Sequence, residues 1–498
     1  MVTPPPGYRR QRSSVQPRRR SRAPVVIGAV VGILLVVAAV GGYRVAIFLH
    51  DVANVGNPFQ LIQKEVEPPV GSVAWKLQHG QQVTILALGY GGAENDAPYL
   101  TDSIMAISLD PVGHRAMEIS IPRDLYAQID AWQDGRPYNE KINAAFEVPN
   151  EPGAFAPGPL KPAFQGQDGP GHLSEATISR LTGLSFDKYA AVDFFAFRDV
   201  VNGLGGIQVH MDTPLDDCHY PDYHNGYLNH GVPPGYRCPP GSGIHFPAGD
   251  YQVNGEQALE LARSRDASEP EQANDFGRSK RQQMIVAAIK KKAVSVSGLA
   301  RAPQLMNALQ SNFRTDMDLA DIKAVYDFVG KLPDTAVEHF AITDQNLVED
   351  FSPYTRGSCG PPAAFVLCPV DPTYRMWQTI FSHAFVPPRA LAEKAPVQLV
   401  NASLSVGDMH TRTTDVLRQL GLQMSDGVRR ATQPTTVIYD YSGGKYPATA
   451  AWLGTFFGAQ VEPVSASPPA AQPAAGQGAQ GLVVVMGSDF ARRWIGIA

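Results

Sequence analysis

Arginine side chains that could bind an anion occur at separate places in the chain, each just after an apolar segment. Arg123 follows MEISIP and has Asp124 beside it, whereas Arg263 and Arg265 follow ELA. A spacing of two residues directs the last pair to one side where the backbone is extended. Guanidinium groups suit phosphate, because their planar fork of N–H donors can contact two oxygens at once. These residues therefore indicate a site for a phosphorylated ligand.

A helix expected from about residue 276 to residue 293 carries more groups of the same chemistry. One stripe at helical spacing holds Arg278, Arg281, Gln282, Ile285 and Ile289. Because the stripe becomes apolar, its first turn should direct two guanidinium groups and an amide toward the protein, near a helix N-terminus that favours anions. A pyrophosphate would relieve the repulsion between such arginines. The alternative is a surface network of ion pairs with nearby acids, namely Asp266, Glu269, Glu271 and Asp275.

Carboxylates that could hold a divalent cation lie earlier in the chain. Asp102 stands in YLTDSI, and Asp96 and Glu94 precede it. Oxygen ligands suit Mg²⁺ (or Mn²⁺), the usual companion of a pyrophosphate. Taken singly, each of these residues can also be a turn or cap residue. Asp102 and Asp124 are also the candidates for a general base.

Several common catalytic signatures are missing from the sequence. It contains no Walker phosphate loop, no HExxH and no GxSxG, which excludes the commonest NTPases and hydrolases. The 498 residues predict two folded domains with connecting segments. With 44% hydrophobic residues and a net charge of -5, the chain has no general charge for nucleic acid, so any anion site must be local.

The N-terminal segment predicts a membrane anchor. Residues 1–22 form a basic arm without an acidic residue, and an apolar run then predicts a transmembrane helix over residues 23–46. The alternative is a cleaved signal peptide, whose apolar core is usually shorter. Because the arginines precede the span, we expect a single-pass protein of the cell membrane with a cytoplasmic N-terminus and an extracytoplasmic catalytic domain. Residues 47–78 are the expected linker.

The cysteines agree with an oxidising compartment outside the cell. The sequence has four of them, in two local pairs, which are Cys218 with Cys238 and Cys359 with Cys368. Two local disulfides are the expected arrangement. Zinc binding is the alternative for the first pair, because His219, His224 and His230 lie nearby.

The hydrophobic patterns predict a domain that starts with a buried strand ending at Gly89. A hairpin of two strands should follow, in SIMAISLD and RAMEISI. We expect one helix in SEATISRLTG, with Ser174 as N-cap and Gly183 as its stop, and another after Asn254, where Gln257 completes a capping box. Residues 301–390 predict an accessory segment packed on this domain. From residue 396, strands and helices alternate in a smaller α/β unit.

The sequence resembles the LytR-CpsA-Psr family through motifs that occur in the family's order over about residues 80–295. They are LALGYGG, TDSIMAISLD, ISIPRD, KINAAF, LTGLSFDKYAAVDFFAF, GLGGIQV, GEQALELARSR and DFGRSKRQQ. The resemblance implies an α/β/α sandwich around a central mixed sheet, as a catalytic domain over residues 79–300. Residues 396–492 resemble the LytR C-terminal domain often attached in actinobacterial members, through VQLVNAS and VVVMGSDF.

Position by position, the resemblance implies a substrate site and a metal site. Arg123, Arg263, Arg265, Arg278 and Gln282 match the pyrophosphate ligands of the family, and Asp102 matches a magnesium ligand. Arg281 fits the same stripe, and Asp124, beside Arg123, is a further catalytic candidate. The sequence departs from the family at Gly91 and Leu100, where an Asp and an Arg are usual. Asp96 or Glu94 would then have to supply the second carboxylate.

The activity implied by the resemblance is that of a phosphotransferase of the EC 2.7.8 kind. Such an enzyme moves a glycopolymer, possible examples including arabinogalactan, from a polyprenyl-pyrophosphate carrier to peptidoglycan, with Mg²⁺ or Mn²⁺ as cofactor. One alternative is a scaffold that binds the carrier-linked glycan without turnover, and another is a pyrophosphatase that acts on the carrier. A role with nucleic acid finds no support, because the cytoplasmic arm is too short for a DNA-reading domain.

Overall fold

The structure is a computed structural model, and it describes most of the chain from residue 67 onward. The end of the predicted linker is wrong, because residues 73–78 form a helix that packs on the central sheet. The described residues are 67–92, 97–136, 138–155, 158–218, 220, 243–264, 267–269, 272, 281, 284–285, 288–289, 292, 313–333, 336–351, 359–360, 366–403, 408–425, 427–429, 431–464 and 481–495.

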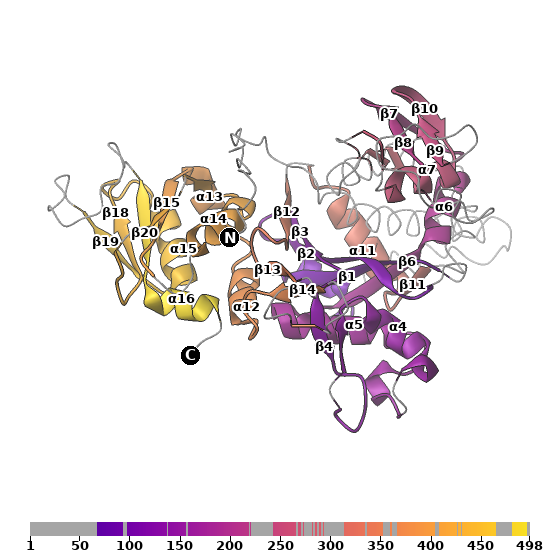
Figure 1. Cartoon of the computed structure of the whole chain (residues 1–498), viewed down its shortest axis with the longest axis horizontal. Helices are drawn as coiled ribbons and strands as arrows, with labels where there is room; N and C mark the ends of the chain where they lie inside the picture. Colours follow the sequence, from indigo (N-terminus) through magenta and orange to yellow (C-terminus); the bar gives the residue numbers. More distant parts are fainter. Residues whose placement is uncertain are drawn as a thin grey trace, which may run out of the picture.

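A mixed sheet of six strands, in the order β11-β6-β1-β2-β3-β12, forms the centre of the larger unit (Figure 1). Neighbouring strands are antiparallel except for β1 with β6 and β3 with β12, which are parallel. This is the mixed α/β architecture expected from the sequence. The strands are β1 (Val83–Tyr90), β2 (Thr101–Asp110), β3 (Arg115–Ile121), β6 (Lys188–Asp193), β11 (Phe313–Thr315) and β12 (Val337–Ala341).

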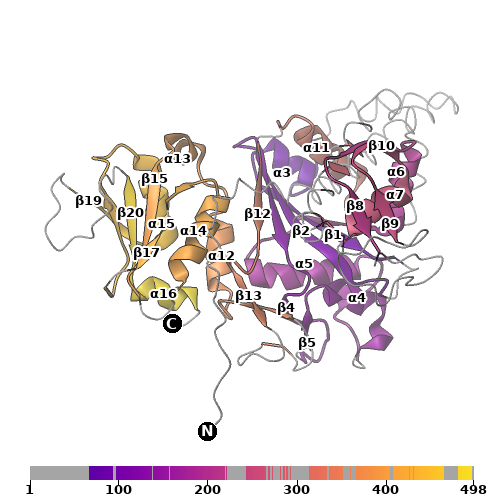
Figure 2. The same cartoon turned by 45° about the horizontal axis from the view of Figure 1, so that its top comes forward.

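Both faces of this sheet are apolar and covered, which explains why β1 is buried along nearly its whole length. On one face, Ile85 and Ile107 pack with residues of α3 (Val73–Gln78) and α11 (Leu319–Val329). On the other face, Leu86 and Ile119 pack with residues of α4 (Ala144–Asn150) and α5 (Gly169–Thr182). Figure 2 shows α3 and α11 on one side of the strands and α5 on the other.

The predicted strands and the predicted hairpin are confirmed, but the start of one helix is wrong. β2 and β3 pair as the hairpin, and β1 ends one residue beyond Gly89. Helix α5 begins at Gly169, so Ser174 lies inside it and donates to the carbonyl of Pro170 (2.8 Å) instead of capping the N-terminus. Proline is favoured in the first turn of a helix, and Pro170 occupies that place. Gly183 ends the helix with φ of 73°, as predicted.

Residues 301–390, predicted as an accessory segment packed on the larger unit, are in part integral to its central sheet. β11 pairs with β6, and β12 pairs with β3, so this segment supplies both edge strands of the central sheet. Short strands with few apolar residues gave no pattern from which this could be predicted. The segment also holds β13 (Val348–Phe351), β14 (Val366–Pro369), α12 (Arg375–Ser382) and α13 (Pro388–Glu393).

A small lobe with its own core stands beyond the end of β6. It contains α6 (Phe194–Gly203), the ribbon of β7 (Ile207–Met211) with β10 (Gly249–Val253), and α7 (Gly255–Arg263). The capping box predicted at Asn254 and Gln257 is present. The short ribbon of β8 (Leu215–Asp217) with β9 (Ile244–Phe246) also belongs to this lobe. Another short ribbon, of β4 (Tyr126–Ile129) with β5 (Tyr138–Lys141), lies outside the lobe, beside α5.

The smaller unit from residue 396 is an α/β unit with one sheet, and its main strands and helices were predicted. Its strand order is β16-β15-β20-β18-β19, with β17 paired to β15. The elements are β15 (Pro396–Asn401), α14 (Met409–Gln419), β16 (Gln423–Met424), β17 (Val428–Arg429), β18 (Val437–Asp440), α15 (Pro447–Phe457), β19 (Gln460–Pro463), β20 (Leu482–Met486) and α16 (Ser488–Trp494).

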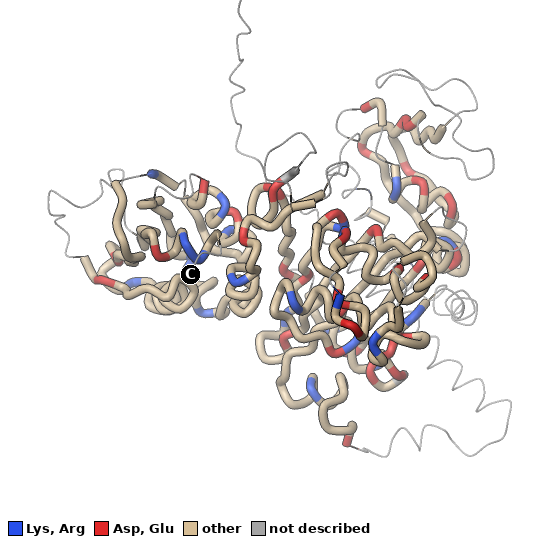
Figure 3. Tube along the Cα trace, turned by 60° about the horizontal axis from the view of Figure 1, so that its bottom comes forward, with Lys and Arg blue, Asp and Glu red and all other residues tan. Residues whose placement is uncertain are grey.

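The two units share one apolar core. A single cluster of buried residues runs from Leu86 and Ile119 through Trp377 and Phe381 of α12 to Leu399 and Trp494. Trp377 is fully buried, and the burial of such a side chain contributes roughly 2–3 kcal/mol. Lys and Arg are interspersed with Asp and Glu over the described parts of both units (Figure 3). The C-terminal unit is therefore packed on the larger unit and not loosely tethered.

Predictions on the membrane anchor and on Cys238 fall outside the described residues. Among the helices described, none is long and apolar enough to cross a bilayer, and the predicted span of residues 23–46 is not among them. Cys359 and Cys368 form the predicted disulfide. Cys218 is also disulfide-bonded.

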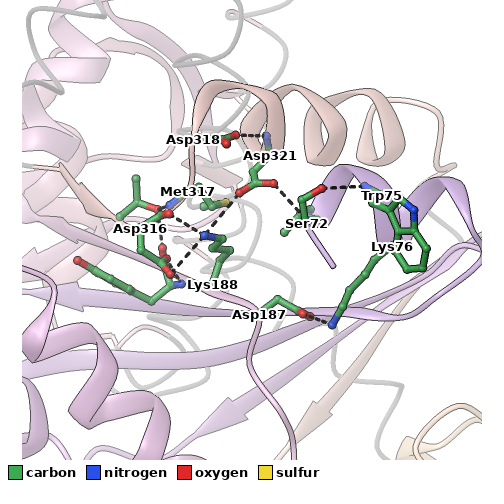
Figure 4. Close-up of polar contacts among 12 residues, drawn as sticks. Ser72, Trp75, Lys76, Asp187, Lys188, Asp316, Met317, Asp318 and Asp321 are labelled. Atoms are coloured by element: carbon green, nitrogen blue, oxygen red, sulfur yellow. Dashed lines mark hydrogen bonds and ion pairs between the residues drawn. The ribbon is translucent and has the colours of Figure 1, made fainter. Parts of the chain in front are cut away.

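Polar groups gather where β6 begins (Figure 4). This is the end of the sheet opposite to the one where β3 leads into Arg123. Lys188 donates to the carbonyl of Asp316 (2.8 Å), and its ammonium lies 3.6 Å from a carboxylate oxygen of Asp321. Asp321 in turn accepts the backbone N–H of Val73 (3.2 Å). These contacts fix α3 and the start of α11 against the sheet. Glu175 of α5 lies close to the same charges.

Glu175→Gln should remove the part of the pH dependence of the free energy of unfolding that comes from Glu175. Burial, reinforced by Asp316, raises the pKa of Glu175 to about 8. A raised pKa in the folded state contributes stability below the ordinary value of 4.5, and this contribution is lost as the pH rises through about 8. Between about pH 5 and pH 9, the wild type should therefore lose roughly 2 kcal/mol relative to the variant. Thermal unfolding at both pH values measures the difference.

The exposed Glu462 of β19 provides the control. Glu462→Gln should follow the wild type at both pH values, whereas a constant offset between the wild type and Glu175→Gln would contradict the assignment.

Candidate functional site

One edge of the central sheet collects the charged residues predicted to bind the ligand. The C-terminal ends of β1, β3 and β6 meet the start of β2 there, because β2 runs antiparallel to its neighbours. The apolar faces of the sheet leave its ends as the places where polar side chains can reach solvent. Asp102 is the second residue of β2, and Arg123 follows β3.

Arg123 lies between two carboxylates at this edge. Its guanidinium forms an ion pair with Asp102, and Nε lies 3.5 Å from Oδ2 of Asp124. The other carboxylate oxygen of Asp124 accepts from Nζ of Lys141 (2.7 Å). Partial burial opposes the charge on Arg123, but the two carboxylates outweigh it and raise its pKa. Asp124 therefore orients Arg123, while the side chains of Arg123 and Asp102 remain 36% and 40% exposed.

Arg263 reaches the same edge from the small lobe. It is the last residue of α7, and its guanidinium stacks on the ring of Phe194, 4.6 Å from the centroid. Phe194 follows β6 directly, so the stack stands at the C-terminal end of that strand. Burial raises the pKa of the nearby Tyr220 hydroxyl, and the charge of Arg263 opposes this rise.

Arg123 and Arg263 therefore lie at the ends of strands separated by β1 and β2. Three strand spacings correspond to roughly 14 Å between the backbones. Arginine side chains are long enough to extend toward each other across this distance, so both guanidinium groups can approach one ligand between them.

The structure corrects the ligand role predicted for Arg281. The stripe prediction is right in that Ile285 and Ile289 are buried in the core of the small lobe. Arg281 itself is 2% exposed, and its guanidinium donates to the carbonyls of Leu261 (2.8 Å) and Ser264. It also donates to Gln272 Oε1 (2.6 Å). A guanidinium committed to the C-terminal end of α7 holds Arg263 in place and does not face a ligand.

The remaining predicted site residues lie outside the described part of the chain. They are Arg265, Arg278 and Gln282 for the substrate, and Asp96 and Glu94 for the metal.

Sequence reasoning missed Asp193, which lies at the same edge. Its carboxylate accepts the N–H of Ala196 (2.7 Å) and so caps α6, the helix that begins with Phe194. Burial raises the pKa of Asp193 to about 6, against the opposing effect of backbone N–H groups. An acid before an apolar helix is a typical N-cap signal, so this residue could have been found.

Arg314 of β11 was also missed. Its guanidinium lies 5.6 Å from the ring centroid of Tyr99 and 6.0 Å from that of Tyr90, distances typical of cation–π contacts. It also donates to Asn150 Oδ1 (2.6 Å). No local sequence signal could have placed it, because the strand contains only three residues.

Asp102 can supply one oxygen ligand to a divalent cation. It is partly exposed and stands beside a cation-rich edge suited to phosphate. Within the described part of the chain, no group of three or more His, Cys, Asp or Glu residues is arranged to hold a metal. Mg²⁺ is often bound by one or two carboxylates with substrate phosphates and water. The described residues therefore fit a cation that is held jointly by Asp102 and a phosphorylated substrate.

The fold is a mixed α/β architecture with Arg123 and Arg263 at one edge of its central sheet. Residues 55–358 match the model of the LytR_cpsA_psr family, more than half of the chain. The chain belongs to the LytR_cpsA_psr family.

Similar proteins are named as transferases. The polyisoprenyl-teichoic acid–peptidoglycan teichoic acid transferase TagU of Bacillus mycoides is 26% identical over 288 residues, which make up 58% of this chain and 77% of that protein. TagV of Bacillus subtilis, with the same named activity, is 26% identical over 321 residues, 63% of this chain and 69% of that protein. The crystal structure of B. subtilis TagV aligns with a TM-score of 0.41 and 23% identity, over 61% of this chain and 97% of that one.

Arg281→Met should destabilise the protein strongly. The variant keeps the apolar stem but leaves the buried carbonyls of Leu261 and Ser264 without their donor. Because an unsatisfied buried polar group costs about 1–3 kcal/mol, we expect a loss of about 3 kcal/mol in the free energy of unfolding. Denaturant titration measures it. Arg492→Met, at an exposed position of α16, is the control and should change stability little. Equal stability of the two variants would restore Arg281 as a ligand candidate.

Proposed function

We propose that this protein transfers a glycopolymer from a polyprenyl-pyrophosphate carrier to peptidoglycan during cell wall assembly. The observation that carries the proposal is that Asp102, Arg123 and Arg263, from distant parts of the chain, lie at one edge of the sheet. Family membership and the transferase names of the similar proteins support it.

The reaction needs charge stabilisation more than covalent chemistry by the protein. A hydroxyl of the wall polymer attacks the phosphorus next to the sugar, the bond from this phosphorus to the bridging oxygen breaks, and polyprenyl phosphate leaves. Negative charge grows on the phosphate oxygens as this happens. Guanidinium groups held in fixed positions offset this charge without having to reorganise, and Arg123 and Arg263 are both held.

The hydroxyl must also lose its proton to an acceptor. Both oxygens of Asp124 face a cation, Lys141 or Arg123, whereas Asp102 pairs with Arg123 through one oxygen, so we assign this step to Asp102. Mg²⁺ or Mn²⁺, when bound, would supply positive charge at the pyrophosphate. Asp102 would help to hold this cation.

We further propose that the glycan is arabinogalactan and that residues 23–46 anchor the enzyme in the cell membrane. The first point rests on the resemblance of residues 396–492 to the C-terminal domain of actinobacterial members. The second rests on the length and apolar character of the segment. Transfer of teichoic acid instead of arabinogalactan would keep the reaction class and change only the substrate.

Arg263→Ala should abolish transfer, with a loss of about 100-fold or more in kcat, because a fixed donor to the transition state is removed. The measurement is covalent attachment of labelled glycan to peptidoglycan by the full-length protein. Arg198→Ala is a matched control, because Arg198 stacks on Phe195 at 4.7 Å as Arg263 stacks on Phe194 at 4.6 Å. Arg198 pairs with Asp199 and should be dispensable.

The same assay separates the alternative functions. Release of phosphate without any acceptor would show that the protein is a pyrophosphatase and not a transferase. Binding of the carrier without turnover would show that it is a scaffold. Full transfer by Arg263→Ala would refute the site itself.

Asp102→Asn should raise the Mg²⁺ concentration needed for half-maximal transfer on the order of tenfold or more, because an anionic oxygen ligand becomes a neutral one. Titration of activity with Mg²⁺ measures this shift. The exposed Asp130, which pairs with Lys161, provides the control variant Asp130→Asn. An unchanged Mg²⁺ requirement in Asp102→Asn would remove Asp102 from the metal site.

A further inference from the structure

Arg412 in the C-terminal unit holds a turn of the larger unit. One nitrogen of its guanidinium donates to the carbonyls of Asp344 (3.1 Å), Asn346 (3.1 Å) and Val348 (3.0 Å). The side chain is 11% exposed, and Asp408 orients it from the preceding turn of α14 (2.6 Å). A cation that binds several backbone carbonyls fixes the course of that segment.

The turn that Arg412 holds follows β12, an edge strand of the central sheet. Asn346 is fully buried, accepts the N–H of Thr343 (2.9 Å) and donates to Asp415 of α14 (2.9 Å). Gln419 of α14 also accepts the N–H of Ala341 (2.6 Å). Helix α14 is thus bonded to the end of β12 and to the turn after it, through residues on three successive turns of the helix.

The turn leads directly into the pair of strands β13 and β14, which contacts the backbone next to Arg123. β13 starts at Val348 and pairs antiparallel with β14. In β14, the N–H of Leu367 donates to the carbonyl of Asp124 (2.9 Å), and Leu367 bridges to Leu125. Asp124 is the residue that orients Arg123, so the backbone next to Arg123 is held by a strand that Arg412 helps to fix.

We propose that Arg412 of the C-terminal unit is a positioning residue for Arg123, acting through β13 and β14. The carbonyl of Asp124 keeps its place only while β14 does, and β14 is placed by β13, whose first residue Arg412 binds. The C-terminal unit thereby has a part in the site. The identity of the ligand that Arg123 binds rests on the proposed function, whereas the coupling between Arg412 and Arg123 does not.

Hydrogen exchange of the full chain tests the coupling without any ligand. In Arg412→Met, the amide of Leu367 and the segment around Leu125 should exchange about tenfold faster, because opening of β14 becomes easier when a charge-assisted contact is lost. Arg418→Met, on an exposed face of the same helix, should exchange like the wild type. Acceleration confined to the turn at Asp344–Val348, with Leu367 unchanged, would overturn the proposal.

Arg412→Lys keeps a positive charge and three N–H donors, and it serves where Arg412→Met fails to fold. The amide of Leu367 should exchange faster in Arg412→Lys than in the wild type, because a single ammonium cannot replace all the contacts of the guanidinium. Exchange at the wild-type rate in Arg412→Lys would overturn the proposal.

Binding of geranylgeranyl pyrophosphate gives a readout that a purely structural role would not move. Arg412→Met should weaken binding about fivefold, and it should have no further effect in the presence of Arg123→Ala, because residues that act through one group are not additive. Multiplied losses in the double variant would overturn the proposal. If the wild type failed to bind this probe, the proposed function would fail, while hydrogen exchange would still decide the coupling.

Discussion

Burial of both faces of the six-stranded sheet is the constraint on which the site depends. β1 carries no charged residue, and the one acid inside β3, Glu118, is buried against His339, so the charged groups that reach solvent lie near the strand ends. The mixed strand directions then bring the end of β3, the start of β2 and the end of β6 to one edge. This edge is where Asp102, Arg123 and the stack of Arg263 on Phe194 stand.

The arginines of this protein divide by their surroundings. Arg281 is buried and satisfies carbonyls at the end of α7, whereas Arg123 is balanced by carboxylates and stays partly exposed. The N–H groups of a buried guanidinium must be hydrogen-bonded within the protein, and only a partly solvated guanidinium has N–H groups available for a ligand. The two kinds cooperate, because Arg281 fixes the helix that ends with Arg263.

The C-terminal unit is joined to the larger unit by apolar packing and by directed polar contacts. Trp377 and Phe381 of α12 belong to a core that extends into both sheets, and Arg412 adds bonds to the turn after β12. Such an interface resists relative motion more than a flexible linker would. The geometry of the edge near Arg123 is therefore a property of both units.

The sequence by itself determined the strands β1, β2 and β3, the capping box of α7 and the alternating elements from residue 396, because these depend on local periodicity and composition. It also marked Arg123 and Arg263 as ligand candidates. Only the tertiary structure decided that residues 301–390 complete the central sheet and that Arg314 stacks on Tyr99. It also decided that the donors of Arg281 are consumed internally. Each of these depends on partners far away in the chain, and a local pattern of residue types contains no record of which distant group a side chain will meet.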